Sequence, residues 1–126
     1  YGRTGASSTS ATRHAIARTK DDAIFKQRRV GGKLVYVVRD LAAGTYRVKL
    51  GFAEFTKVAR GKRVVDVLVD GRKRLKRYDV GARTKKPFRA VWASATVNHS
   101  AGAMKIVVDG VRGKAILNAL RVTELD

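Results

Sequence analysis

The sequence predicts an all-β fold, an antiparallel β-sandwich built as a single domain over residues 1–126. Apolar and polar residues alternate over short runs, which is the two-residue period of a strand with one buried face. Turn signals every ~8–12 residues separate about seven or eight such runs, and no long stretch has the helical period. A chain of 126 residues can bury one core and needs no second domain.

Residues 46–71 contain the two clearest strands. Between residues 46 and 52 every second residue is Tyr, Val, Leu or Phe. After the loop 54–62, residues 63–69 are rich in valine and stop at Asp70-Gly71, a dipeptide suited to a tight turn with positive φ. We expect these two strands to pair as a hairpin.

The remaining elements are assigned from shorter runs. Residues 1–12 are rich in Gly, Ser, Thr and Ala, so we expect a flexible terminus or a surface loop there. The expected strands are residues 23–29, 33–38 (apolar on both faces, hence central), 72–80 (an edge with a solvated face), 88–97, 104–108 and 115–122. The expected turns and loops are residues 30–32, 40–44, 81–86, 98–102 and Asp109-Gly110. The residues expected to point inward near the end of the chain are Met104, Ile106, Val108, Ile116, Leu120 and Val122.

Charge is the unusual quantity of this sequence. The 28 Lys and Arg residues against 10 Asp and Glu give a formal net charge of +18, with a pI near 11.2. Such a field attracts nucleic acid, acidic polysaccharide, acidic protein or an anionic membrane surface. By itself the charge predicts solubility and non-specific association, but neither fold nor specificity.

Residue content excludes several functional classes. The absence of cysteine excludes a disulfide framework, thiolate zinc sites and cysteine nucleophiles. Ser7, Ser8 and Ser10 lack a nucleophile-elbow context, and Gly31-Gly32 lacks the Lys-Ser continuation of a phosphate loop. There is no run of about 18 apolar residues, and the start at Tyr1 has no apolar stretch like that of a signal peptide. We therefore expect no enzyme and no cofactor, and the compartment stays open.

Several motifs occur in an informative order: residues 16–25, Arg29, Tyr36, residues 44–54 ending in Phe52-Ala53-Glu54, residues 63–71 with Val65-Asp66-Val67, Tyr78-Asp79-Val80, and residues 116–122 with Asn118-Ala119-Leu120. Over residues 16–122 this order and spacing resemble the malectin and malectin-like carbohydrate-binding domains. The resemblance implies a jelly-roll-like β-sandwich of the galactose-binding type. It also implies glycans as the ligand class, no catalytic activity, and an extracellular or secreted setting.

The sequence departs from that family in two ways. The family opens with an additional strand and a Gly-containing loop, and only residues 1–15 are available here, so we expect this part to be shortened or absent. In animal malectin, aromatic residues after the early Arg and after the Phe-Ala-Glu block hold the sugar, together with an aspartate before the final strand. The matching places here hold Val30, Thr56 with Lys57, and Gly113. We therefore expect that this chain does not bind a sugar in the way animal malectin does. A different mode of glycan binding stays open, because bacterial malectin-like modules vary at these positions.

We expect glycan binding at loops on one end or face of the sandwich. The expected carbohydrate-binding residues are Arg29, Phe55, Thr56, Lys57, Arg112 and Lys114. Phe55, Phe88 and Trp92 do not fit the strand pattern, and we favour their interpretation as core residues over one as exposed ligand rings.

Glu54 and Asp66 are the candidate carboxylate pair for acid–base chemistry. We favour a framework role in which they accept backbone or Arg hydrogen bonds, with Arg29 as a candidate partner. His14 and His99 lie in polar, turn-like settings without a third ligand at metal spacing, so we predict no metal site there. The loop aspartates are candidates for a structural calcium, although loop turns explain them equally well: Asp21, Asp22, Asp70 and Asp109.

Basic residues are enriched over residues 60–89, where 12 of the 28 Lys and Arg residues lie. This enrichment favours a second function, a polyanion-binding or assembly scaffold driven by charge. The residues expected to carry it are Arg72, Lys73, Arg74, Lys76, Arg77, Arg83, Lys85 and Lys86.

Acidic residues lie largely where the family framework or a turn uses them, whereas outward positions such as Arg47, Lys49, Lys105 and Arg121 are basic. This pattern results when surface positions are changed to Lys or Arg and structural ones are spared. We hypothesise a positively supercharged, engineered malectin-like scaffold; the alternative is a natural basic surface that binds an acidic polymer. The sequence thus predicts a non-catalytic carbohydrate-binding module with altered glycan binding, and the polyanion scaffold as its alternative.

Overall fold

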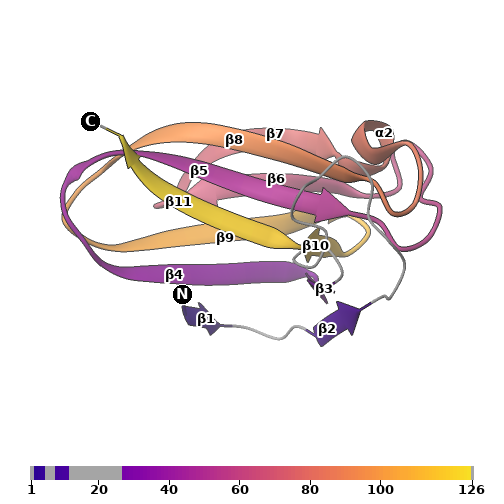
Figure 1. Cartoon of the computed structure of the whole chain (residues 1–126), viewed down its shortest axis with the longest axis horizontal. Helices are drawn as coiled ribbons and strands as arrows, with labels where there is room; N and C mark the ends of the chain where they lie inside the picture. Colours follow the sequence, from indigo (N-terminus) through magenta and orange to yellow (C-terminus); the bar gives the residue numbers. More distant parts are fainter. Residues whose placement is uncertain (1, 5–7, 12–26, 126) are drawn as a thin grey trace.

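The computed structural model describes residues 2–4, 8–11 and 27–125, and most of these residues form antiparallel strands (Figure 1). The expected all-β fold is confirmed. The elements are β1 (Gly2–Thr4), β2 (Ser8–Ala11), β3 (Gln27–Gly31), β4 (Lys33–Leu41), β5 (Gly44–Ala53), β6 (Val64–Val69), β7 (Arg72–Asp79), α2 (Val80–Thr84), β8 (Ala90–His99), β9 (Gly102–Arg112), β10 (Ala115–Leu117) and β11 (Ala119–Leu125). None of the helical residues in this part of the chain forms a segment long and apolar enough to cross a membrane.

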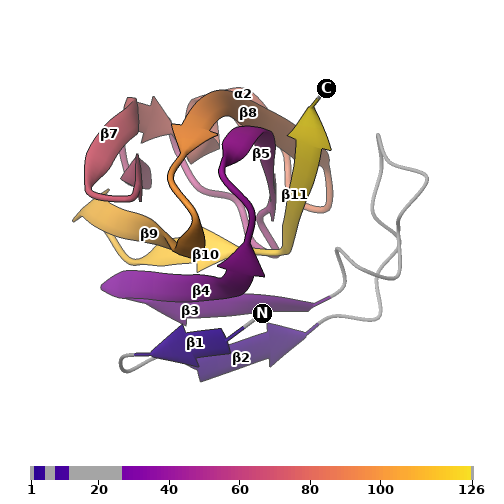
Figure 2. The ribbon, with the colours of Figure 1, turned by 90° about the vertical axis from the view of Figure 1, so that its left-hand side faces the viewer.

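The strands form two main layers (Figure 2). A five-stranded sheet has the order β1-β4-β9-β6-β7, and a three-stranded sheet has the order β11-β5-β8. A short third sheet, β10-β3-β2, lies toward the same end of the molecule as α2 (Figure 1). As expected, β4 has a neighbour on each side and β7 is an edge strand.

One hydrophobic core fills the space between the layers. Alternate residues of β5, β6 and β9 enter it because successive side chains of a strand point to opposite faces. All three inward predictions for β9 are confirmed, and Ile116 is fully buried while Leu120 and Val122 pack against the core half-buried. The fully buried side chains include Leu34, Val48, Leu50, Phe52, Val65, Val67, Val69, Met104, Ile106 and Ile116.

The predicted hairpin of residues 46–71 is wrong. β5 belongs to the three-stranded sheet and β6 to the five-stranded sheet, so the loop between them crosses from one layer to the other. The turn at Asp70-Gly71 instead joins β6 to β7, with φ of 52° at Asp70 and 81° at Gly71. Both strands bury one face in the same core, and the alternation of apolar and polar residues predicted this burial correctly. Alternation does not specify which strand each of them pairs with.

The final third of the chain differs from expectation at two places. Asp109-Gly110 is not a turn but lies inside β9, beside a register shift in its pairing with β6. Gly110 is there because a Cβ atom would come within 2.6 Å of the Gly113 carbonyl oxygen. The expected strand 115–122 is broken at Asn118 into β10 and β11, which belong to different sheets. Asn118 fixes this crossover, since its Oδ1 accepts from the Ala53 amide at 2.9 Å.

Other boundaries shift by smaller amounts. Gly31 belongs to β3, so the turn expected at residues 30–32 is confined to Gly32. Residues 81–86, expected as a loop, largely form α2, because Asp79 accepts from the Ala82 amide at 3.0 Å and caps the helix. β4 continues to Leu41 and β8 to His99, which shortens both connections that follow them. The described residues hold eleven strands rather than about seven or eight.

The N-terminal residues include two strands where a loop was expected. β1 pairs with β4 and β2 pairs with β3, both antiparallel. The flexibility expected for residues 1–12 and the shortened segment expected over residues 1–15 stay predictions. Residues 12–26 lie outside the described residues, and with them the first part of the strand expected at 23–29, His14, Asp21 and Asp22.

Candidate functional site

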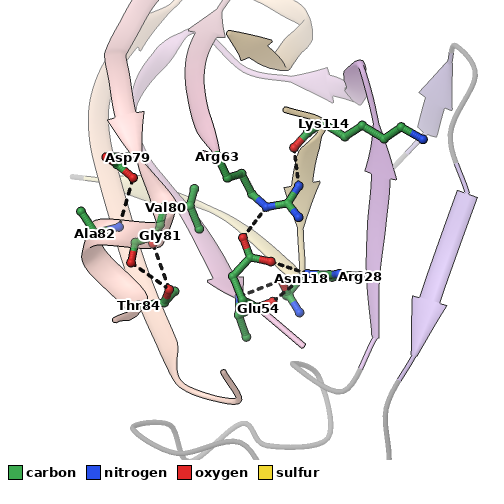
Figure 3. A network of polar contacts seen from close by, with 11 residues as sticks. Arg28, Glu54, Arg63, Asp79, Val80, Gly81, Ala82, Thr84, Lys114 and Asn118 are labelled. Carbon is green, nitrogen blue, oxygen red and sulfur yellow. Dashed lines mark hydrogen bonds and ion pairs between the residues drawn. The ribbon is translucent and has the colours of Figure 1, made fainter. Parts of the chain in front are cut away.

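A buried ion network holds one end of the sandwich together (Figure 3). The side chain of Glu54, at the end of β5, is 1% exposed, and its carboxylate accepts from Arg28 Nη1 at 2.8 Å and from Arg63 Nε. Arg63 also donates to the carbonyl oxygen of Lys114 in the β9–β10 turn. The framework role expected for Glu54 is therefore confirmed, with Arg28 and Arg63 as partners in place of Arg29.

Asp66 belongs to a separate network. Its Oδ1 accepts from the Arg77 amide at 2.7 Å, and its Oδ2 lies 3.1 Å from Lys73 Nζ. The Arg77 amide, helped by Lys73 and opposed by burial, holds the pKa of Asp66 below its usual value. These bonds fix the bulge in β7 where Arg77 has a φ of 51°. Asp66 and Glu54 share no described partner, so the structure does not assemble them as an acid–base pair.

The loops expected to bind carbohydrate meet at the same end as the Glu54 network. At Gly113, where φ is 67°, a Cβ atom would lie 2.6 Å from the Lys62 carbonyl oxygen, so the β9–β10 turn packs directly on the β5–β6 loop. Arg112 lines a cleft of about 400 Å³ with Arg60 and Lys62. The other expected residues are not gathered into this cleft. Thr56, Lys57 and Lys114 are exposed, and Arg29 lies half-buried in β3 opposite Leu117.

Phe55 is not a free sugar-stacking ring. Its centroid lies 6.3 Å from that of Phe88 with an interplanar angle of 14°, and the Arg28 guanidinium carbon lies 4.4 Å from it. Together with Trp92, the two phenylalanines pack half-buried over the buried residues Ala53, Ala90 and Ala119. The three aromatic residues thus form a small, half-buried cluster outside the main core, so they are packed side chains but not the core residues that were favoured.

A second cleft, of about 630 Å³, lies between β7, α2 and Arg60. It shares Arg60, Arg77 and Asp79 with the cleft beside Arg112, so the two clefts are adjacent. We call the combined feature the basic groove. Its charged and aromatic residues are Arg60, Lys62, Lys76, Arg77, Tyr78, Asp79, Arg83, Lys85 and Arg112.

Asp79 holds the walls of the basic groove in place. Its Oδ2 accepts from the Gly61 amide at 2.7 Å, while its Oδ1 caps α2. Gly81 of α2 packs equally closely, since a Cβ atom there would lie 2.7 Å from the Ala59 carbonyl oxygen. The β5–β6 loop is therefore bound to α2 by one carboxylate and one close backbone contact.

Tyr78 supplies an aromatic wall to the groove. Its ring stacks on Phe52 at 5.5 Å, and the Arg83 guanidinium carbon lies 5.3 Å from its centroid. Burial raises the pKa of Tyr78, and the nearby Arg83 charge opposes that rise. The Tyr78 ring is thus packed against the core residue Phe52 and against the Arg83 cation of the groove.

The residues expected to bind polyanions are divided by the structure. Lys76, Arg77, Arg83 and Lys85 lie in the basic groove. Arg72 and Arg74 line a different cleft of about 520 Å³, with Asn98 and His99. Lys73 is paired with Asp66, and Lys86 is exposed. Sequence reasoning did not assign Arg60 and Lys62 to a site; their only signal is their place in the loop that follows the Phe-Ala-Glu block.

His99 is buried rather than placed in a polar turn as expected. Its Nδ1 lies 2.6 Å from Asp70 Oδ2, and its Nε2 lies 3.0 Å from the Gly102 carbonyl oxygen. Both partners are acceptors, so the doubly protonated ring satisfies both bonds, and the Gly102 carbonyl followed by Asp70 raises the pKa of His99. No group of three His, Cys, Asp or Glu side chains suited to a metal occurs among the described residues.

The fold is that of a galactose-binding-like β-sandwich, and its sequence matches the malectin domain over residues 2–122. The chain belongs to the malectin domain family, a family of carbohydrate-binding modules. The match begins well ahead of residue 16, where the resemblance found in the sequence began. No curated protein matches this chain.

Solved structures with the same fold come from bacteria and plants. A β-glucuronidase from Bacteroides uniformis superposes with a TM-score of 0.81 at 16% identity, covering 99% of this chain and 14% of the enzyme chain. The ANXUR2 extracellular domain from Arabidopsis thaliana gives 0.80 at 14% identity over 99% of this chain and 41% of that one. A structure of the plant peptide RALF23 in complex with FER and LLG2 gives 0.79 at 15% identity, over 98% and 41% of the two chains. The chain therefore spans less than half the length of each, and at these identities the likeness shows the fold alone.

Proposed function

We propose that this malectin domain is a non-catalytic carbohydrate-binding module for acidic glycans, chains that carry uronate carboxylates or sulfate esters, and that it binds them in the basic groove. The observation that supports the proposal is the charge balance of the groove. Seven Lys and Arg residues line it with one carboxylate, Asp79, a local balance of 7 − 1 = +6. Both oxygens of Asp79 already accept backbone hydrogen bonds.

The groove has the chemical groups that an acidic sugar needs. Guanidinium groups bind carboxylate and sulfate oxygens through paired, charge-assisted hydrogen bonds, and Arg60, Arg77 and Arg112 line the same cleft. Tyr78 also lines the groove, but its ring is packed against Phe52 and the Arg83 guanidinium, so the proposed recognition depends on the cations. Volumes of about 630 and 400 Å³ are within the range of small-ligand sites, roughly 300–1,000 Å³.

The same groove offers little support for catalysis. Its only described carboxylate is Asp79, which is engaged with the Gly61 and Ala82 amides. Glycoside hydrolysis generally uses two carboxyl groups across the scissile bond. The fold similarity to a β-glucuronidase concerns 14% of that enzyme's chain and carries no activity to this one.

Binding and variant measurements test the proposal. Isothermal calorimetry with a uronate hexasaccharide is expected to give saturable binding that weakens at least tenfold in the double variant Arg77→Gln/Arg83→Gln. The matched control is Arg39→Gln with Lys105→Gln, which removes two exposed charges outside the groove and is expected to change the affinity about threefold or less. Equal losses in the two double variants would show that general charge, rather than the groove, binds the glycan.

A second candidate function is a polyanion-binding or assembly scaffold in which the fold only displays charge. The observation that favours it is the spread of cations beyond the groove, such as Arg72 and Arg74 in the cleft beside His99. This function predicts equal affinity for single-stranded DNA and RNA of equal charge and complete loss of glycan binding at ~0.5 M salt, where the Debye length is a few Å. Discrimination between two neutral disaccharides would contradict it.

The engineered origin of the basic surface stays a prediction. Its support is that the acidic residues Glu54, Asp66 and Asp79 are engaged in structural contacts while Arg47 and Lys105 are exposed. A natural homologue with the same surface Lys and Arg residues, one for one, would discard this hypothesis in favour of natural binding to an acidic polymer.

A further inference from the structure

The outer face of the three-stranded sheet β11-β5-β8 has a composition that the basic groove does not explain. We use "outer face" for the residues of these strands that point away from the core. Besides small residues and those at the strand ends, they are Arg47, Lys49, Trp92, Ser94, Thr96, Arg121 and Thr123. Among the outward residues of these three fully described strands there is no Asp or Glu, since Glu124 lies opposite the inward-facing Tyr46.

The pairing register arranges the outer face in two rows across the sheet. Lys49 lies directly opposite Arg121 on one side and Ser94 on the other. Two residues along, Arg47 lies opposite Thr123 and Thr96. Each row thus joins cationic and hydroxyl-bearing side chains at the spacing of neighbouring strands, about 4.8 Å.

Lys49 and Arg121 form a like-charge pair, which is normally unfavourable at directly opposite positions. Trp92 compensates for it in this fold. Lys49 Nζ lies 4.8 Å and Arg121 Cζ 5.3 Å from the Trp92 ring centroid, so the ring attracts both cations and keeps them close together. A bound anion would relieve the remaining repulsion between them. Two cations are therefore held close together on this face.

We propose that the outer face is a second binding surface for acidic saccharide units. Lys49 and Arg121 bind the carboxylate or sulfate, and the hydroxyl groups of Ser94, Thr96 and Thr123 hydrogen-bond the sugar hydroxyls. This inference takes its ligand class from the proposed function but does not depend on the basic groove. A nucleic acid fits less well, because single-stranded DNA or RNA is bound by a series of available aromatic rings. The three rings beside this face are packed with one another and with cations: Phe55 lies against Phe88 and Arg28, and Trp92 lies against Lys49 and Arg121.

Trp92 also makes the proposal directly measurable, because it is the only tryptophan in the chain. Titration with a uronate hexasaccharide is expected to change Trp92 fluorescence in a saturable way. Lys49→Gln/Arg121→Gln is expected to weaken that fluorescence-detected affinity at least tenfold, while Arg77→Gln/Arg83→Gln leaves it within about threefold. Arg121→Gln alone is the milder variant, and a melting curve for each variant establishes that it is folded.

The outcomes separate this surface from the basic groove. Calorimetric saturation without any change in Trp92 fluorescence overturns the outer-face proposal and leaves the groove intact. A fluorescence response that is abolished by the Arg77/Arg83 variant overturns it as well, since the response then belongs to the groove. A response to oligothymidylate of equal charge at equal or higher affinity assigns the face to nucleic acid instead. The same calorimetric affinity and the same number of bound hexasaccharides in the unaltered chain and in the Arg77/Arg83 variant, with a persistent Trp92 response, refutes the groove and supports the outer face.

Discussion

Replacing Glu54 by Gln tests the most concentrated interaction in this fold. The carboxylate of Glu54 is 1% exposed and binds Arg28 and Arg63, whose side chains are 10% and 14% exposed. Removing one partner of a buried ion pair costs about 3–5 kcal/mol, because it leaves an uncompensated charge away from water. Since the two arginines keep some access to water, we expect about 3 kcal/mol. For a domain of this size that corresponds to a melting temperature lower by on the order of 10 °C.

Urea unfolding followed by circular dichroism measures this loss. The matched control is Glu124→Gln, the same chemical change at an exposed residue, with an expected loss below about 0.5 kcal/mol. The triple variant Arg28→Met/Glu54→Leu/Arg63→Met removes all three charges and is expected to be more stable than Glu54→Gln alone. A loss below about 1 kcal/mol for Glu54→Gln would refute the reasoning that this network holds the loop end together.

Three further predictions follow from other contacts. Because the pKa of His99 is raised on folding, protonation of His99 stabilises the fold fully below about pH 6.5, and this stabilisation is lost as the pH rises through the folded pKa. Urea melts between pH 5.5 and 9 are expected to show the free energy of unfolding decline, and His99→Asn is expected to remove that pH dependence. Asp79→Ala removes the cap of α2 and the partner of the Gly61 amide, so we expect the free energy of unfolding to fall by about 1–2 kcal/mol and the uronate hexasaccharide to bind more weakly in calorimetry. Unchanged glycan affinity would contradict the role of Asp79 in shaping the groove. Gly113→Ala is expected to lower the melting temperature more than Gly71→Ala. Both positions have positive φ, but a Cβ atom at residue 113 would lie 2.6 Å from the Lys62 carbonyl oxygen, whereas no atom lies within 4 Å at residue 71. Equal shifts would show that backbone strain alone sets the loss of stability.

The sequence was sufficient for the fold class because strand alternation is a local signal. Tyr46 to Phe52 and Met104 to Val108 alternate between core and surface, and the structure buries these inward residues as predicted. Pairing was not predictable in the same way. The β5–β6 hairpin failed because two strands that face one core have the same pattern whether they lie in one sheet or in opposite sheets.

The glycine and aspartate signals were ambiguous for a related reason. Asp70-Gly71 forms the expected tight turn, whereas Asp109-Gly110 lies inside a strand because Gly110 meets a neighbouring backbone. A dipeptide does not reveal which of these two reasons requires its glycine. His99 was likewise misplaced, since its buried position depends on Asp70 and Gly102, which the β6–β7 and β8–β9 turns bring together.

The candidate site was predicted only in part. Arg77, Arg83 and Arg112 were singled out from the sequence, but for two different sites, and the structure joins them in one groove. That joining depends on Asp79, which binds the β5–β6 loop and α2 at once through contacts between distant residues. The pairing of Lys49, Arg121 and Trp92 required the strand register, which composition does not contain.

The central claim is that this malectin domain recognises acidic glycans rather than glycans in general. The most direct measurement is calorimetric titration of the unaltered chain with a uronate hexasaccharide and with a neutral hexasaccharide of the same length, at ~0.15 M salt, where the Debye length is about 8 Å. We expect the uronate chain to bind at least tenfold more tightly, because seven cations line the groove with one engaged carboxylate. Equal affinity for the two sugars, or no binding of either, would contradict the account.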